Sequence, residues 1–141
     1  MKSETFHIKT IDELVPVIQH IKNLCASNSI FRIDGEMGAG KTTLISKVCI
    51  ALEINDKPSS PTYSIVNSYL SDRFGEINHF DFYRIEDENE ALESGLDEPF
   101  YNGSICFIEW AEKVQNILPE EMVNINIELL ENNHRKITIT S

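Results

Sequence analysis

The sequence predicts an α/β fold, with a mixed β-sheet flanked by helices and an antiparallel hairpin at its C-terminal end. A glycine-rich stretch joins an apolar segment to an amphipathic one, as at a strand–loop–helix junction. Residues 105–108 are continuously apolar, which is typical of a strand buried on both faces. Apolar and polar residues alternate near the C-terminus, as in strands with one solvated face. We expect one domain over residues 1–141, because that length is typical of one.

The N-terminal part predicts a short strand followed by a helix. Residues 5–8 are the strand candidate. Apolar residues at three- and four-residue steps predict a helix over residues 11–25, with Thr10 or Asp12 as its cap. Pro16 fits this helix only within the first turn, because a later proline would remove a helical hydrogen bond.

The second half of the chain is richer in strands. Residues 63–69 and 77–82 are rich in β-forming residues and are predicted strands, with a turn at residues 71–75 between them. Alternating apolar residues over 123–129 and 137–139 predict an antiparallel hairpin that turns at residues 131–134. An acidic stretch over residues 86–95 predicts a short helix between these two pairs of strands. Two prolines and two serines make residues 56–61 a loop.

The charge balance excludes one broad class of function. Lys and Arg total 12 and Asp and Glu total 23, a net charge of −11. A surface that grips nucleic acid needs clustered cations, so any contact with RNA is expected to pass through a more basic partner.

Compartment signals point to the cytoplasm. The first residues lack the apolar core of a secretory signal, and no apolar run reaches the ~20 residues of a membrane span. Cys25, Cys49 and Cys106 form no Cys-x-x-Cys motif and have apolar neighbours, which favours reduced core thiols over a redox or zinc site.

The strongest motif is a phosphate-binding loop. Residues 35–42 read Gly-Glu-Met-Gly-Ala-Gly-Lys-Thr, between a strand predicted at residues 30–33 and a helix predicted at residues 41–52. Glycines let backbone N–H groups turn inward on phosphate oxygens, and the helix adds its positive end. Lys41 is expected to reach the β- and γ-phosphates, and the Thr42 hydroxyl to bind magnesium. The expected nucleotide-binding residues of this loop are Gly35, Met37, Gly38, Ala39, Gly40, Lys41, Thr42 and Thr43.

Two carboxylates are candidates to hold magnesium or position water. Glu109 directly follows the apolar run 105–108, where the carboxyl end of a strand faces the ligand crevice of an α/β sheet. Asp81 shares a strand face with His79 and Tyr83 by alternation. From spacing alone, Asp81 is either a second functional carboxylate or a hydrogen-bonded acid at a strand end.

Other phosphate-loop classes lack their signals in this chain. No Asn-Lys-x-Asp of GTPases and no Leu-Ser-Gly-Gly of ABC transporters occurs. Small-molecule kinases of this fold carry several arginines in a lid, whereas this chain has four arginines in all. Between Arg84 and Lys113 there is no basic residue and there are nine acids, so a kinase is the second hypothesis.

Four segments together resemble the TsaE (YjeE) family, a family of bacterial P-loop ATPases needed to make threonylcarbamoyladenosine beside the tRNA anticodon. They are residues 35–43, Ser60-Pro61-Thr62-Tyr63, His79-Phe80-Asp81-Phe82-Tyr83-Arg84 and Glu109-Trp110-Ala111-Glu112. The segments occur in the family's order and spacing, and the resemblance covers essentially the whole chain.

The resemblance implies roles for individual residues. Lys41 and its loop would bind ATP, and Thr42 and Glu109 would hold Mg²⁺. Asp81 would be important for hydrolysis, and Thr62 would lie in a switch segment that senses the γ-phosphate.

The resemblance also points to three residues around the nucleotide. Trp110 matters in the family, through packing or through contact with the site. Arg135 matches a family arginine near the nucleotide, or is an ordinary charge of a hairpin turn. The stretch around Thr10 and Ile11 would line the adenine.

The family works with the TsaB–TsaD pair, in which TsaD carries the transferase site, so the resemblance implies these partners and only indirect contact with tRNA. The acidic residues of 86–98 fit a solvated helix face better than a docking surface. We expect a partner-dependent ATPase in which ATP orders residues 60–63 and hydrolysis resets the complex. A nucleotide-binding adaptor without catalysis is the third hypothesis, disfavoured by two carboxylates at one site.

Overall fold

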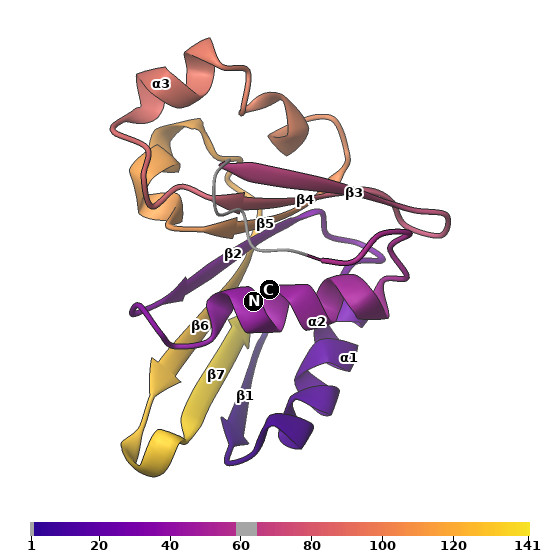
Figure 1. The fold of residues 1–141 in the computed structure, drawn as a ribbon, viewed down its shortest axis with the longest axis vertical. Coiled ribbons are helices and arrows are strands. Elements are labelled where there is room, and N and C mark those ends of the chain that lie inside the picture. The colour runs from indigo at the N-terminus through magenta and orange to yellow at the C-terminus, as the bar shows by residue number, and fades with distance from the viewer. Residues whose placement is uncertain (1, 59–64) are drawn as a thin grey trace.

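A computed structural model describes residues 2–58 and 65–141 and shows a layered α/β fold (Figure 1). Its strands are β1 (Ser3–Ile8), β2 (Ile30–Gly35), β3 (Val66–Ser71), β4 (Gly75–Asp81), β5 (Ile105–Glu109), β6 (Val123–Leu129) and β7 (Arg135–Thr140). Its helices are α1 (Leu14–Leu24), α2 (Lys41–Ala51) and α3 (Glu88–Glu93), with 3₁₀ segments η1 (Ile11–Glu13), η2 (Glu98–Phe100), η3 (Ala111–Ile117) and η4 (Glu131–Asn133).

The strands of the described residues form one mixed sheet in the order β1-β7-β6-β2-β5-β4-β3. The four central strands β6, β2, β5 and β4 are parallel, whereas β1, β7 and β3 pair antiparallel at the two edges. The mixed sheet and the C-terminal hairpin of β6 and β7 are therefore confirmed. Because the central strands are parallel, β2, β4 and β5 all end on the same side of the sheet. An α/β sheet binds its ligand beyond these carboxyl ends.

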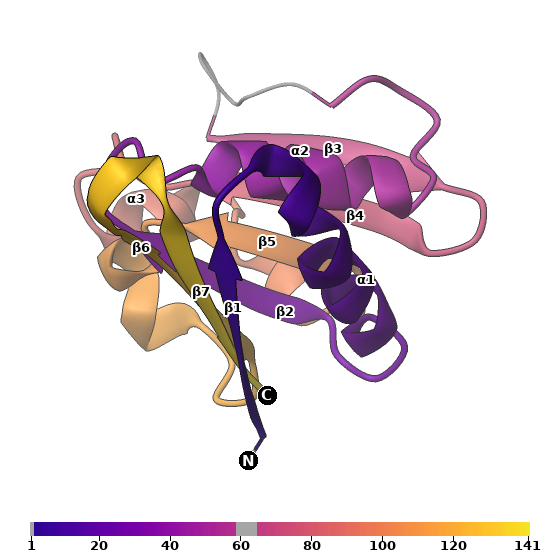
Figure 2. The same cartoon turned by 90° about the horizontal axis from the view of Figure 1, so that it is seen from below.

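Helices α1 and α2 pack together on one face of the sheet (Figure 2). Their buried side chains join alternate residues of the strands in one apolar core, which includes Leu14, Val17, Ile21, Phe31, Leu44, Ile45, Val48, Phe107, Ile125 and Ile139. The packing of α2 on the sheet places its N-terminus over the end of β2 and beside β5. The core formed by α1, α2 and this face of the sheet, the main core, therefore holds the phosphate loop in place.

The other face of β2, β4 and β5 carries a second core. It is covered by α3, η2 and η3, and its members include Ile30, Phe80, Phe82, Ala91, Phe100, Ile108 and Val114. Strand alternation separates the two cores, so residues that follow Ile77 and Phe107 at two-residue steps face α2. His79, Asp81 and Glu109 are therefore on the α2 face, where the phosphate loop lies.

The N-terminal helix begins as a 3₁₀ turn and continues as α1. The Glu13 carboxylate accepts the backbone N–H of Thr10 at 3.1 Å, which confirms Thr10 as the cap. Pro16 lies in the first turn of α1, where its missing N–H costs no helical hydrogen bond.

The acidic helix is shorter than the predicted 86–95. Asp87 caps α3 by accepting the Glu90 N–H at 3.1 Å, which fixes its first residue at Glu88. Gly95 at φ 71° follows the helix in the left-handed conformation that often ends helices.

The cysteines are unpaired, as expected. Cys49 and Cys106 are buried and Cys25 is half-buried against the main core. Burial raises the pKa of each thiol to about 12, so none is a ready nucleophile at neutral pH. Within the described residues, no helix combines the length and apolarity needed to cross a bilayer.

The contact between Phe31 and Phe107 tests this architecture, because these rings pack 5.1 Å apart across the β2–β5 pair. We expect Phe107→Ala to lower the free energy of unfolding by about 3–5 kcal/mol, since the side chain is fully buried. Urea unfolding measures this, with Val15→Ala, exposed on α1, as a control that changes stability by less than about 0.5 kcal/mol. Equal effects of the two substitutions would contradict the assigned core.

Candidate functional site

The phosphate loop connects β2 to α2 through a backbone that only glycine accommodates at three points. Gly38 and Gly40 have φ of +84° and +104°, in the left-handed region. Gly35 is needed for another reason: a Cβ there would lie 2.7 Å from the backbone oxygen of Ile127 on β6. These glycines turn the chain so that α2 begins at Lys41 and directs its N-terminus into the loop.

Lys41 is buried, with 6% of the residue exposed, and its ammonium contacts both the loop and the residue that follows β5. Its Nζ donates to the Gly35 carbonyl at 2.7 Å and lies 3.9 Å from the centre of the Trp110 ring. Trp110 has φ 58°, a strained conformation for a bulky residue, and its ring packs 5.0 Å from that of Tyr83. Trp110 also packs against the core on the other face of β4 and β5, so the structure shows both packing and contact with Lys41 at this residue.

The carboxylate of Glu109, at the end of β5, is buried and hydrogen-bonded on both sides. The Thr42 hydroxyl donates to its Oε2 at 2.9 Å, from the first turn of α2. On β4, His79 Nε2 lies 2.6 Å from the same oxygen. Glu109 and His79 are 2% and 1% exposed. The predicted juxtaposition of Thr42 and Glu109 is thus present, and His79 joins it.

Asp81 pairs in register with Glu109 on the neighbouring parallel strand. Its Oδ1 accepts the backbone N–H of Tyr83 at 3.0 Å. Burial raises the pKa of this carboxyl and the charge of Glu109 adds to the rise, whereas the Tyr83 N–H and the charge of Lys41 act in the opposite direction. Asp81 is therefore a half-buried carboxyl with a raised proton affinity, next to the phosphate loop.

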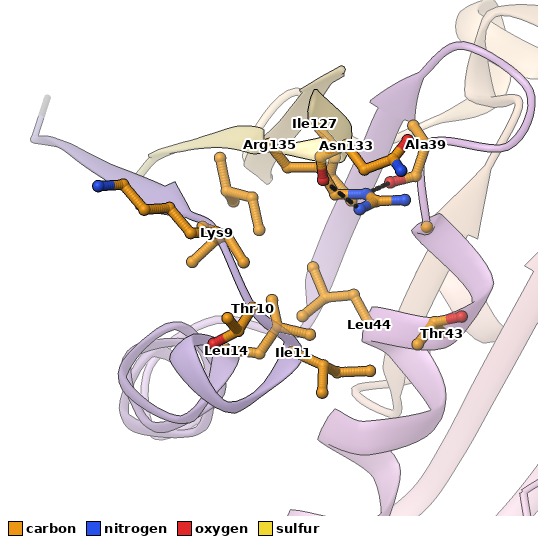
Figure 3. A pocket seen from close by; sticks show the side chains of 13 residues that line it. Lys9, Thr10, Ile11, Leu14, Ala39, Thr43, Leu44, Ile127, Asn133 and Arg135 are labelled. Carbon is orange, nitrogen blue, oxygen red and sulfur yellow. Dashed lines mark hydrogen bonds between the residues drawn. The ribbon is translucent and has the colours of Figure 1, made fainter. Parts of the chain in front are cut away.

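Two adjoining pockets surround the loop. The polar one is lined by Met37, Gly38, Gly40, Lys41, Thr42, Thr43, Asp81, Tyr83, Glu109, Trp110 and Arg135. The apolar one is lined by Ile8, Lys9, Thr10, Ile11, Leu14, Ala39, Gly40, Thr43, Leu44, Ile127, Asn133, Arg135 and Ile137 (Figure 3). They share Gly40, Thr43 and Arg135, so a ligand with a charged end and an apolar end could occupy both.

Arg135 connects the C-terminal hairpin to the phosphate loop. Its Nε donates to the carbonyl of Ala39 at 2.7 Å, and its Nη1 donates to the carbonyl of Asn133 at 3.1 Å (Figure 3). Ile11 lines the apolar pocket and is 58% exposed, so its side chain is available to a ligand. Met37 is also exposed, at the rim of the polar pocket.

The residues fit a magnesium ion. Hydroxyl and carboxylate oxygens from Thr42 and Glu109 are hard donors of the kind Mg²⁺ prefers. Among residues 2–58 and 65–141, no group of three or more His, Cys, Asp or Glu could hold a metal.

Sequence reasoning assigned no role to His79 or Tyr83, although it grouped both with Asp81 on one strand face. The parallel register of β4 and β5 brings His79 to Glu109, and register cannot be seen in a single strand's sequence. The predicted switch residue Thr62 lies outside the described residues.

Comparisons with known proteins identify the family of this chain. A family model described as threonylcarbamoyl adenosine biosynthesis protein TsaE matches residues 8–137. The Bacillus subtilis tRNA threonylcarbamoyladenosine biosynthesis protein TsaE is 38% identical over 112 residues, which cover 79% of this chain and 69% of that protein. The Haemophilus influenzae protein of the same name is 40% identical over 97 residues, covering 68% of this chain and 60% of its own length.

A solved structure gives the same picture for the fold. The crystal structure of Bacillus subtilis YdiB superposes with a TM-score of 0.72 at 26% identity, covering 99% of this chain and 86% of that one. Because the family model spans most of the residues and the curated relatives exceed 30% identity, the chain belongs to the TsaE family.

Proposed function

We propose that this chain is a P-loop ATPase that supports threonylcarbamoyladenosine modification of tRNA together with the TsaB–TsaD pair. Its family membership supports the pathway, because the relatives are named for it. The observation that best supports ATP hydrolysis is that one polar pocket is lined by Lys41, Thr42, Asp81 and Glu109. This combination offers a phosphate cradle, a cation site and a separate proton acceptor.

The phosphates of ATP would lie in the loop. The turn at Gly38 and Gly40 and the first turn of α2 present N–H groups and a helix N-terminus to the polyphosphate. On binding, Lys41 would exchange its contacts with the Gly35 carbonyl and the Trp110 ring for phosphate oxygens, to which its ammonium can give three donors.

Thr42 and Glu109 would hold Mg²⁺ at the phosphates. When bound, the cation offsets the negative charge that develops on the transferred phosphoryl group. The Thr42 hydroxyl keeps its proton while its oxygen acts as a ligand, so the hydrogen bond to Glu109 can remain and orient both groups.

Asp81 is the better of the two acids to accept a proton from water. Glu109 already accepts hydrogen bonds from two side chains, whereas in the part of the chain that the structure describes the Asp81 carboxylate accepts one backbone N–H, and its pKa is raised. In hydrolysis the water oxygen bonds to the γ-phosphorus, the bond to the β–γ bridging oxygen breaks, and ADP leaves. We assign Asp81 the positioning and deprotonation of that water, and Glu109 the cation.

The adenosine would occupy the apolar pocket. Ile11 and Leu44 lie on one side of it and Arg135 and Asn133 on the other (Figure 3), so a planar base can be enclosed between aliphatic and polar groups. Thr43 and Gly40 line both pockets, which puts the base and the phosphates at the two ends of one continuous site.

The charge of the chain supports a protein partner. At −11, the surface repels the tRNA backbone, so a tRNA-modification role is best served by docking on TsaB–TsaD. Thr62 and its neighbours would then couple nucleotide state to docking, as the family resemblance implies.

Asp81→Asn separates binding from hydrolysis. We expect ADP affinity within about twofold of wild type, and ATP hydrolysis at least about 10²-fold slower, as for loss of a general base.

The same substitution also has an expected effect on stability. Because folding raises the pKa of Asp81, its ionised form opposes folding at neutral pH. The asparagine variant should therefore melt at the same or a higher temperature, most clearly above the folded-state pKa. Single-turnover kinetics and thermal melts measure both effects. Wild-type hydrolysis by this variant would refute the role, and Asp72→Asn, in the β3–β4 turn, is the control.

The apolar pocket can be tested with two exposed aliphatic residues of the N-terminal helix. Ile11→Ala should weaken ADP binding about 3–10-fold, because it removes apolar contact with the base. Val15→Ala, at a position that is also exposed but lies outside the pocket, should leave the affinity unchanged. Calorimetric titration with ADP measures both. If inorganic triphosphate binding falls as much as ADP binding in the Ile11 variant, the base does not occupy this pocket.

Partner dependence is tested by ATP hydrolysis of the purified protein, alone and with TsaB–TsaD. We expect slow turnover by the protein alone and at least about 10-fold faster turnover with the pair. This lower bound is below the activation that partner proteins give other P-loop enzymes. Lys41→Ala is the blank, since it removes the ammonium that reaches the phosphates. Turnover that ignores the pair would keep the ATP site but reject the partnership.

A further inference from the structure

His79 is a buried polar residue whose role the phosphate-loop chemistry above leaves unassigned. It lies on β4, is 1% exposed, and its Nε2 is 2.6 Å from Oε2 of Glu109. When Glu109 is ionised its carboxylate offers only acceptors, and the imidazole then donates this hydrogen bond through Nε2–H. A short hydrogen bond between two enclosed side chains fixes both rotamers, because neither group can turn to water for a substitute.

Among residues 2–58 and 65–141, Glu109 has two side-chain donors, and they differ in what else they do. Thr42 comes from α2 and shares its oxygen with the cation in the proposed function. His79 comes from β4 and touches neither pocket. Of these two donors, His79 is therefore the one whose contact does not depend on the ligand, so it can hold the carboxylate in place before nucleotide arrives.

The neighbouring residue on the same strand provides a natural contrast. Asn78 is also 1% exposed, but it faces the other side of the sheet. There it accepts a hydrogen bond from Ser68 at 2.6 Å and donates one to Ser104 at 3.1 Å. On one face of β4, His79 thus contacts the Glu109 carboxylate. On the other face, Asn78 joins β4 to its neighbouring segments through Ser68 and Ser104.

We propose that His79 is a positioning residue that aims the Glu109 carboxylate at Thr42 and thereby sets the affinity of the site for Mg²⁺. The proposal rests on the proposed function, in which Thr42 and Glu109 hold that ion. Groups that orient a metal-binding carboxylate commonly change metal affinity 10–100-fold when removed, even though they never touch the metal.

The test measures binding of Mn²⁺, a spectroscopic stand-in for Mg²⁺, to the full chain with saturating ADP, by electron paramagnetic resonance. His79→Leu should raise the Mn²⁺ dissociation constant about 10–100-fold, while ADP affinity in EDTA stays within about twofold of wild type. His79→Gln can return an N–H near the position of Nε2 and should recover most of the affinity. His79→Asn, whose shorter amide cannot reach Glu109, should not.

Asn78→Leu is the matched control, because it removes an equally buried polar group from the next position of β4. It should destabilise the protein without changing Mn²⁺ affinity. If His79→Leu fails to fold, the comparison of His79→Gln with His79→Asn still tests the positioning role, since both variants keep a polar side chain.

Three results would overturn the proposal, and they are distinguishable. Wild-type Mn²⁺ affinity in His79→Leu or His79→Asn rejects the positioning role and leaves the proposed function standing. Equal losses in the glutamine and asparagine variants, accompanied by weaker metal-free ADP binding, show a purely structural role. If the wild-type protein adds no Mn²⁺ affinity to that of free ADP, the assignment of Thr42 and Glu109 fails, and the role of His79 fails with it.

Discussion

The buried carboxylate of Glu109 is the constraint on which the rest of the site depends. A carboxylate withdrawn from water must be surrounded by donors, and leaving it unpaired would cost several kcal/mol. Its donors come from Thr42 at the start of α2 and His79 on β4. The hydrogen bonds of the Glu109 carboxylate therefore depend both on the packing of α2 on the sheet and on the register between β4 and β5. A fold that satisfies Glu109 has already brought the phosphate loop to the carboxyl ends of the strands.

The phosphate loop is held from the opposite side by the C-terminal hairpin of β6 and β7. Gly35 approaches the Ile127 oxygen of β6 so closely that a side chain could not fit, and Arg135 of β7 donates to the Ala39 carbonyl. The loop thus lies between the parallel strands that carry the carboxylates and the hairpin that carries the apolar pocket. This position explains why both pockets include Gly40, Thr43 and Arg135.

Much of this arrangement could be predicted from the sequence, because the signals are local. The phosphate-loop motif fixed Lys41 and Thr42, and the apolar run before Glu109 indicated a buried strand ending at a ligand crevice. Spacing alone left Asp81 ambiguous, since alternation identifies its strand face but not what that face meets, and only the family resemblance implied its role in hydrolysis.

Contacts between distant elements could not be predicted in this way. The hydrogen bond between His79 and Glu109 depends on the register of two strands separated by the whole of α3 and η2. The contact of Lys41 with Trp110 depends on a left-handed backbone at a non-glycine residue, for which no sequence pattern exists. Ile11 entered the site only through the family resemblance, because an exposed isoleucine in a helix carries no chemical signal of its own.

The features that cost stability gather at one edge of the sheet. Trp110 has a strained backbone, Asp81 is a half-buried carboxyl whose ionised form the fold disfavours, and Glu109 is a charge enclosed by protein. The second core, by contrast, is built from well-packed aromatic rings such as Phe80, Phe82 and Phe100. Folding alone would select against all three features, and a rigid core behind β4 and β5 makes them tolerable. Their concentration around Lys41 is what a site prearranged for a highly charged ligand requires: the protein has already ordered and desolvated the groups that, in the proposed function, the phosphates and their cation would meet.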